Sequence, residues 1–204
     1  MSGVPTRERM LQAATPLFAQ RGYEGASTRD LVSAAGVNIA MISYHFGDKE
    51  GLYHAVLQRS YASMLDLEVP ALLPDSSADR VRALTRAVYF FCRERRDAVR
   101  LLLRHVLEQG SLPEAIRLEG TAQLFERLDS IQQLLGLSNF AERRLELLSL
   151  NHLVARYAVS DLADLTPFVD DQRPEDAVAD HLGDLAVRLL LGEGLVEQSG
   201  TDVL

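Results

Sequence analysis

Tryptophan is absent from this chain of 204 residues, and cysteine occurs once, at Cys92. A single cysteine cannot form an internal disulfide, and no secretory or transit segment opens the sequence, so we expect a cytoplasmic protein in a reducing compartment. No apolar run approaches the roughly 18 residues of a membrane span. With 47% hydrophobic and 25% charged residues, the composition is that of a globular protein rather than a disordered one.

Positive charge is also scarce, because the net charge is −8 and the only lysine is Lys49. An acidic total excludes a protein that coats nucleic acid over its whole surface. Through Tyr53, however, the positive and negative charges balance, so the remainder carries the entire −8. This distribution predicts that the N-terminal part can approach a polyanion while the rest cannot. The balanced charges are Arg7, Arg9, Arg21, Arg29 and Lys49 against Glu8, Glu24, Asp30, Asp48 and Glu50.

Apolar residues recur three and four positions apart along nearly the whole chain, and strand-like alternation is rare. The pattern predicts an all-α fold of about nine helices, with a small domain at 1–53 and a larger helical domain at 54–204. In the larger domain we expect helices near 77–94, 97–109, 113–135, 139–163 and 174–192.

Capping residues divide the first 68 residues into four helices. Thr6 is the expected N-cap of the first helix. Ser27 or Thr28 would cap a short second helix that ends at Gly36. A third helix is expected from Asn38 to Phe46, and a fourth from a cap at Asp48 to about Glu68.

Residues 28–46 form the most informative pattern, because a short turn containing Gly36 joins two short helices. This is helix-turn-helix geometry, in which the second helix reads bases in the major groove of DNA. Asparagine can pair with adenine there, and methionine or isoleucine can touch a thymine methyl. A helical hairpin that serves only packing is the alternative. The residues expected to face inward are Leu31, Val32, Val37, Ile42 and Phe46. Those left facing outward on the second helix are Asn38, Ile39, Met41, Ser43, Tyr44 and His45.

Residues 8–57 resemble the N-terminal domain of the tetracycline-repressor (TetR) family, without gaps and over about a quarter of the chain. The matching residues are Ala13-Ala14, Leu17-Phe18, Arg21-Gly22-Tyr23, Ser27-Thr28-Arg29, Ala35-Gly36-Val37, Tyr44-His45-Phe46 and Lys49-Glu50-Gly51-Leu52. The stretch from Gly36 to Glu50 is similar to a subgroup with an Asn-Tyr-His-Phe-Gly-Ser-Lys pattern. Ser43 stands where an aromatic residue is frequent, and Ile39 to Met41 is unusually apolar, so we expect a different base preference.

The resemblance implies a role for each matching residue at a DNA interface. Thr28 would bind a phosphate, and Arg29 a guanine edge or a phosphate. Lys49 would hold a phosphate at the positive end of the fourth helix, and its place beside the reading helix indicates the same role independently. Two alternatives stay open: Arg29 as a solvated arginine beside Asp30, and His45 as a packing histidine. Asn38, Ile39, Met41 and Ser43 would face bases, with Tyr44 and His45 on backbone phosphates.

For the larger domain, the resemblance implies an effector pocket and a homodimer formed by the last two long helices. Polar residues inside apolar stretches are the candidates for the pocket, because buried polar groups need partners that a ligand can supply. A domain rich in leucine, valine and alanine predicts a small, largely apolar effector. Histidines satisfied by the core or the dimer interface are the alternative. The candidates are Arg104, His105, Asn151, His152, Arg156 and Tyr157.

These features predict a homodimeric, ligand-responsive repressor that binds a pseudo-palindromic operator. The alternative is a helical interaction adaptor that does not bind DNA. We expect no enzyme, cofactor or metal site, since the catalytic motifs of hydrolases and phosphate-binding loops are missing and the histidines lack metal-ligand spacing. The sequence does not identify the effector, the operator or the regulated genes.

Overall fold

The computed structural model describes residues 4–68, 74–118, 131, 132, 135, 140–169 and 173–192. Every regular element in these ranges is a helix, which confirms the predicted all-α class. None of the helices described is long and apolar enough to cross a membrane. The chain forms two compact units: unit 1 comprises Met1–Asp66 with Arg95–Phe125, and unit 2 comprises Leu67–Glu94 with Glu126–Leu204.

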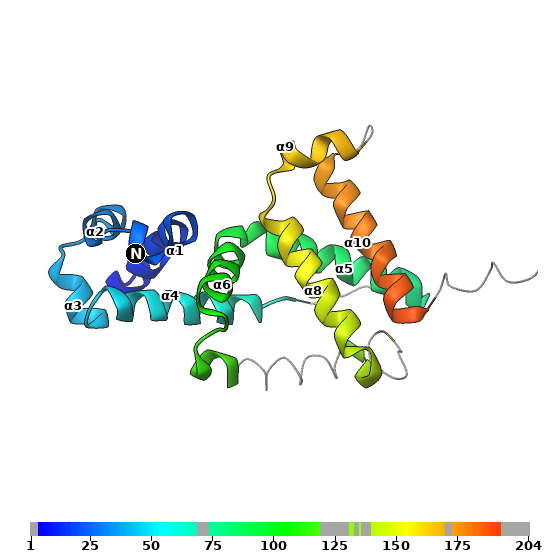
Figure 1. The fold of residues 1–204 in the computed structure, drawn as a ribbon, viewed down its shortest axis with the longest axis horizontal. Helices are drawn as coiled ribbons and strands as arrows, with labels where there is room; N and C mark the ends of the chain where they lie inside the picture. Colours follow the sequence, from blue (N-terminus) through cyan, green and yellow to red (C-terminus); the bar gives the residue numbers. More distant parts are fainter. Residues whose placement is uncertain are drawn as a thin grey trace, which may run out of the picture. The chain divides into compact units, whose positions relative to one another are not determined.

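Unit 1 contains α1 (Thr6–Gly25), α2 (Thr28–Ala35), α3 (Ala40–Phe46), α4 (Lys49–Met64) and α6 (Arg96–Gln109), and its residues 114–118 are helical as well. Helix α1 packs against α2, α4 and α6, as Figure 1 shows in blue, cyan and green. Phe18, Leu57 and Leu101 are completely buried at the centre of this group. The apolar face of α6 thus completes the core on which the helix-turn-helix segment rests, because a short three-helix segment alone buries little apolar surface.

Local capping chemistry fixes the boundaries of α2 and α4. Ser27 Oγ accepts a hydrogen bond from the backbone N–H of Asp30, whose carboxylate accepts one from the Ser27 N–H in return. Gly36 ends α2 in the left-handed region, with φ 62°. Asp48 Oδ1 accepts from the N–H of Gly51 at 2.8 Å and starts α4. Three caps expected from the sequence are therefore present, with Ser27 chosen over Thr28.

Other boundaries differ from the sequence prediction. Thr6 is the first residue of α1 rather than its N-cap, a position that Pro5 holds without a side-chain hydrogen bond. Helix α3 begins at Ala40 rather than Asn38, and Asn38 Oδ1 accepts the N–H of Ala40, the first residue of the helix. Helix α4 ends at Met64, ahead of the predicted Glu68.

Gly51 allows α3 and α4 to approach each other closely. A Cβ atom at this position would lie 2.0 Å from the backbone carbonyl oxygen of Phe46, the last residue of α3. Backbone atoms cannot move aside as the end of a flexible side chain can. Any side chain at position 51 would therefore displace α3 relative to α4.

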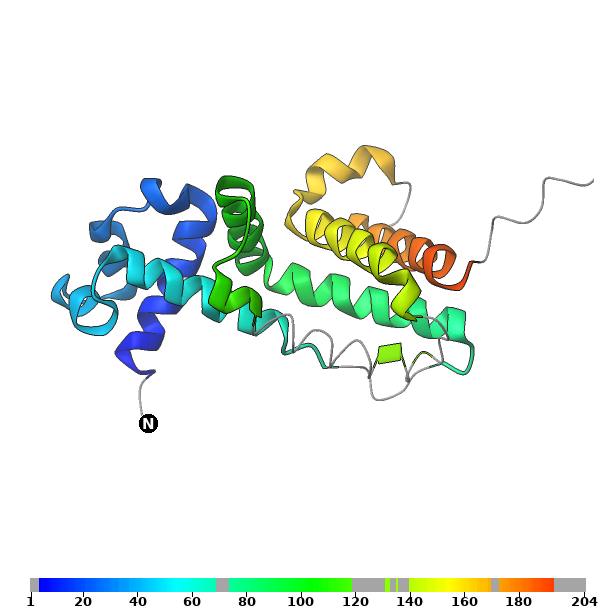
Figure 2. The same ribbon diagram turned by 60° about the horizontal axis from the view of Figure 1, so that its bottom comes forward.

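Unit 2 contains α5 (Ser77–Glu94), η1 (Phe140–Arg143), α8 (Arg144–Val159), α9 (Leu162–Leu165), η2 (Thr166–Phe168) and α10 (Pro174–Leu191). Helices α5, α8 and α10 pack against one another, as Figure 2 shows. Arg86 on α5 binds Asp176 and Asp180 of α10, and Arg82 binds Asp184 at 2.8 Å. The predicted helix at 77–94 is confirmed. The helix predicted at 139–163 is instead divided into η1, α8 and α9. Most of the helix expected at 113–135 lies outside the described residues.

Candidate nucleic-acid interface

Helix α3 presents a solvent-exposed face of the size that enters a major groove. Ile39 is 54% exposed and Tyr44 78% exposed, and Asn38 and Ser43 are exposed beside them. Met41 differs from the prediction, because it is half-buried and packs against the core of unit 1. His45 is half-buried as well, so the outward face has two exposed residues fewer than expected, and its apolar part centres on Ile39.

Asn38 occupies the corner between α2 and α3. Its side-chain oxygen accepts the Ala40 N–H at 3.0 Å, so this oxygen caps α3 in the free protein. The Nδ2 group makes no hydrogen bond within the described part of the chain and has two donors. A base reached by Asn38 would thus meet two free donors and an oxygen that is already partly occupied.

The N-terminus of α2 carries two of the predicted DNA-contacting residues. Thr28 is the first residue of α2 and is half-buried, while Arg29 is exposed. Asp30 is already engaged by the Ser27 cap and by Arg21 Nη1 at 3.1 Å. These interactions lower the pKa of Asp30, chiefly through the hydrogen bond from the Ser27 side chain, next through that from the Ser27 backbone N–H, and least through the neighbouring Arg21. Across the described residues, Arg29 forms no ion pair and keeps its charge in solvent.

Aromatic rings line the C-terminal end of α3. The His45 ring contacts Tyr44 edge-on at 4.8 Å between centroids and lies 6.1 Å from Phe46. Because His45 is half-buried between these rings, a packing role and a phosphate-binding role both remain compatible with its surroundings. The sequence interpretation did not include Arg7, whose guanidinium lies over the Phe46 ring at 5.3 Å. No local pattern pairs two residues so far apart in the sequence.

Lys49 is the first residue of α4, as predicted, but its ammonium group already has a partner. Nζ lies 4.3 Å above the centroid of the Tyr23 ring, a cation–π contact. This contact holds the lysine side chain near the start of α4 without neutralising its charge. The ammonium can therefore still attract a phosphate, beside the positive end of the helix dipole.

In unit 1, two of the predicted effector residues are engaged by other protein groups. Arg104 donates to Glu108 Oε1 at 3.1 Å and to the backbone oxygen of Gln20. His105 is 6% exposed, and its Nδ1 lies 3.1 Å from Tyr53 Oη. Burial lowers the pKa of His105 and raises that of Tyr53 to about 12, so both groups are neutral at neutral pH. As the alternative interpretation expected, His105 is a buried histidine with a protein hydrogen-bond partner, but only its Nδ1 atom has that partner.

In unit 2, the other predicted effector residues lie on α8. Asn151, His152 and Arg156 are exposed, and Tyr157 is half-buried with its ring 6.5 Å from that of His181. Arg156 Nη1 donates to Ser160 Oγ at 3.0 Å, at the end of the same helix. These four side chains therefore lie largely on the solvent-exposed side of α8 rather than in the core of unit 2.

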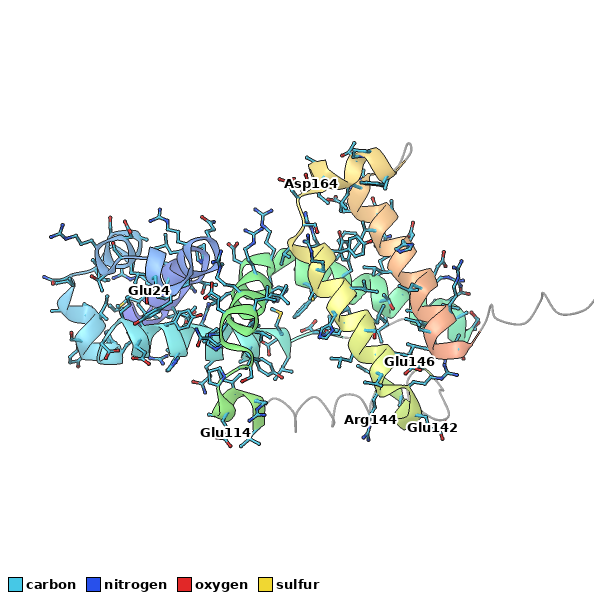
Figure 3. The ribbon with its side chains drawn as sticks, viewed as in Figure 1. Glu24, Glu114, Glu142, Arg144, Glu146 and Asp164 are labelled. Carbon is cyan, nitrogen blue, oxygen red and sulfur yellow. The ribbon has the colours of Figure 1, made fainter. Side chains whose placement is uncertain are left out.

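Apolar residues are also exposed on α8. Leu145 is 75% exposed and Leu148 49% exposed. Figure 3 labels the charged residues Glu142, Arg144 and Glu146 around the start of this helix. An apolar stripe bordered by charges is typical of a protein–protein contact surface.

Comparison with known proteins is consistent with this geometry. Residues 10–56 match the family model described as "Bacterial regulatory proteins, tetR family". The chain is 40% identical over 62 residues to the HTH-type transcriptional repressor AcnR of Corynebacterium glutamicum, which is 30% of this chain and 33% of AcnR. It is 27% identical over 112 residues to the probable HTH-type transcriptional regulator YttP of Bacillus subtilis, covering 53% of this chain and 54% of YttP. The chain thus spans between a third and about half the length of these curated relatives.

Solved structures share the fold over nearly the whole chain. A TetR-like transcriptional regulator from Rhodococcus sp. RHA1 superposes with a TM-score of 0.63 at 22% identity, covering 95% of this chain and all of that one. The putative transcriptional regulator SCO4942 from Streptomyces coelicolor gives a TM-score of 0.65 at 21% identity, covering 91% and 98%. At these identities the likeness establishes the all-helical architecture of both units.

Proposed function

We propose that this chain is a sequence-specific DNA-binding transcriptional regulator of the tetR family, acting as a homodimeric repressor that releases its operator when an effector binds, because residues 10–56 match the family model of these bacterial regulators. The exposed face of α3, with Ile39 and Tyr44 standing out from a capped helix-turn-helix corner, is the observation that carries the proposal. Thr28, Arg29 and Lys49 flank it as phosphate-binding groups, and Tyr44 and His45 complete the rim.

Two copies of α3 would read successive major grooves of a pseudo-palindromic operator, with half-site centres roughly 34–36 Å apart. One seven-residue reading helix makes too few base contacts for tight specific binding, so the proposal requires a dimer. The exposed stripe of Leu145 and Leu148 on α8, together with α10, is the proposed dimer surface. Effector binding would then favour a spacing of the two reading helices that does not fit the operator.

The test is selection of duplex DNA from a random pool by the purified protein, followed by titration of the selected and scrambled duplexes at several salt concentrations. A regulator will select a two-fold repeat, and its affinity will fall steeply with salt. If no duplex is enriched and no salt-dependent isotherm appears, the chain is a helical interaction adaptor rather than a regulator.

The proposed effector is a small, largely apolar molecule, and each set of candidate residues is tested separately. Neutral and acidic lipophilic compounds are screened for release of the selected duplex, first with the unsubstituted protein. The screen is then repeated with His105→Ala in unit 1 and His152→Ala in unit 2. A loss of response in either variant assigns the effector to that unit, whereas an unchanged response in both contradicts the assignment.

A further inference from the structure

We propose that an open groove in unit 1 binds a small organic ammonium ion, at a site distinct from the DNA-reading face of α3. The groove encloses about 550 Å³. Its walls come from the end of α1, the first turns of α4, the end of α6 and the segment that follows α6. This inference assigns a cationic ligand class to a groove that shares His105 with the effector candidates of unit 1, where the proposed function expects a neutral or acidic effector. The binding itself does not depend on DNA recognition.

Carboxylates dominate the rim of the groove. Glu24, Glu50, Glu108 and Glu114 line it against a single arginine, Arg117. Figure 3 labels two of them, Glu24 in the last turn of α1 and Glu114 in the segment after α6. Arg104 partly balances Glu108 at 3.1 Å. Negative charge therefore remains in excess, which disfavours an anionic ligand and favours a cation.

Aromatic rings form a connected surface beside these carboxylates. The Tyr23 and Tyr53 rings meet edge to face with centroids 5.1 Å apart, and Tyr53 lies 5.7 Å from the His105 ring. Tyrosine faces attract ammonium groups, and Tyr23 already holds the Lys49 ammonium at 4.3 Å. Burial raises the pKa of Tyr23, and the nearby carboxylates of Glu50 and Glu24 raise it further.

His105 supplies a polar group at the inner side of the groove. It is 6% exposed and lines the groove, and its hydrogen bond to Tyr53 uses Nδ1 only. Nε2 has no hydrogen-bond partner in the described part of the chain. When Nδ1 carries the proton and donates it to Tyr53 Oη, Nε2 has a free lone pair that can accept a hydrogen bond from an N–H or O–H group of the ligand, such as the hydroxyl of choline. Burial lowers the pKa of His105, so the imidazole stays neutral and does not repel a cation.

The donor set fits an organic cation better than a metal ion. Within the described ranges, no three histidine, cysteine, aspartate or glutamate side chains converge as metal ligands. The carboxylates instead border an aromatic surface, the combination that recognises alkylammonium groups.

The experiment measures binding of choline and of its uncharged tert-butyl analogue to the full chain by titration calorimetry. Saturable choline binding at least about tenfold tighter than binding of the analogue is expected, since only the charge differs. Glu24→Gln and Glu50→Gln should each weaken choline binding about fivefold. Glu142→Gln, an exposed carboxylate in unit 2, is the matched control and should leave it unchanged.

Equal binding of the two compounds, or no saturable binding of choline, overturns the proposal. An equal loss in the Glu142→Gln variant does so too, because it would indicate attraction by the overall negative charge rather than by the groove. Duplex binding is measured on the same preparations. Choline binding without any duplex binding would refute the proposed regulator and leave the ammonium site in place.

Discussion

Asn38 has two roles that compete for one carbonyl oxygen: it caps α3 through the Ala40 N–H, and it is proposed to read a base. The substitution Asn38→Asp separates them, because a carboxylate still accepts the Ala40 N–H but has no donors and adds a charge that repels phosphate. We expect the melting temperature to stay close to that of the unsubstituted protein and specific DNA affinity to fall by about 1–3 kcal/mol. Thermal melts and duplex titrations measure the two effects. Asn38→Ala is the comparison and should also lose about 1 kcal/mol of stability; equal DNA affinity in both variants and the original protein would remove Asn38 from the reading set.

Lys49 is expected to contact phosphate rather than bases, because its ammonium extends from the N-terminus of α4 over Tyr23. Lys49→Gln should weaken binding to specific and scrambled duplexes alike and reduce the slope of log affinity against log salt by about one. Titrations at four or more salt concentrations supply the slope. Arg173→Gln, an exposed arginine of unit 2, is the control. A selective loss on the specific duplex would mean that Lys49 reads sequence.

His105 should make the stability of the protein depend on pH. Burial lowers its pKa below the ordinary value of 6.5, so the unfolded chain takes up a proton more readily than the folded chain does. The free energy of unfolding is therefore highest above pH 6.5, the ordinary histidine pKa, and it decreases as the pH falls below that value. His105→Gln should lose less stability than the original protein between about pH 8 and about pH 5.5, as measured by denaturant unfolding. His152→Gln, exposed on α8, should leave the pH dependence unaltered; a parallel change in both variants would contradict this origin.

At the scale of elements, the angle between α3 and α4 depends on the absence of a side chain at Gly51. Alanine there would place Cβ 2.0 Å from the Phe46 carbonyl oxygen, so α3 would have to move. We expect Gly51→Ala to cost about 1–3 kcal/mol of stability and to lose specific DNA binding by more than that loss explains. Denaturant unfolding and duplex titration of the same sample provide the comparison.

Gly183 in α10 is the matched control for this prediction. A Cβ atom there would lie 3.4 Å from Arg82, an ordinary contact distance, and alanine favours helices over glycine. Gly183→Ala should therefore be neutral or stabilising. If Gly51→Ala also binds the duplex normally, the close approach of α3 and α4 is not required for reading.

At the scale of the whole molecule, the proposed function depends on a second copy of the chain. Leu145 on α8 is 75% exposed, and an aspartate there would place a charge in the proposed apolar interface without disturbing the core of unit 2. We expect Leu145→Asp to be a folded monomer whose operator affinity falls by at least about a hundredfold. Light scattering gives the mass. Leu107→Asp, where the leucine is 86% exposed on α6, should remain dimeric; a dimeric Leu145→Asp protein would move the interface elsewhere.

Features that depend on local interactions could be predicted from the amino-acid order alone. The helix at 77–94 agrees with α5 to the residue, and the caps at Ser27, Gly36 and Asp48 are present because each involves hydrogen bonds or backbone angles within a few residues. The helix-turn-helix pattern and its resemblance to the tetR family could be identified for the same reason. Periodicity also assigned Ile42 and Leu31 correctly to the core.

Features that join distant parts of the sequence depend on how the helices pack. Met41 packs inward, Lys49 lies on Tyr23, and Tyr53 bonds to His105, 52 residues further along the chain. Helical periodicity fixes which side of its own helix a residue occupies, but not which residue of another helix it faces. The contacts between helices follow from how whole helices pack. Examples are the close approach of the end of α3 to Gly51 and the inclusion of α6 in unit 1. The acidic groove arises in the same way, since α1, α4 and α6 each contribute only two or three of its carboxylates or rings to a surface that no single segment encodes.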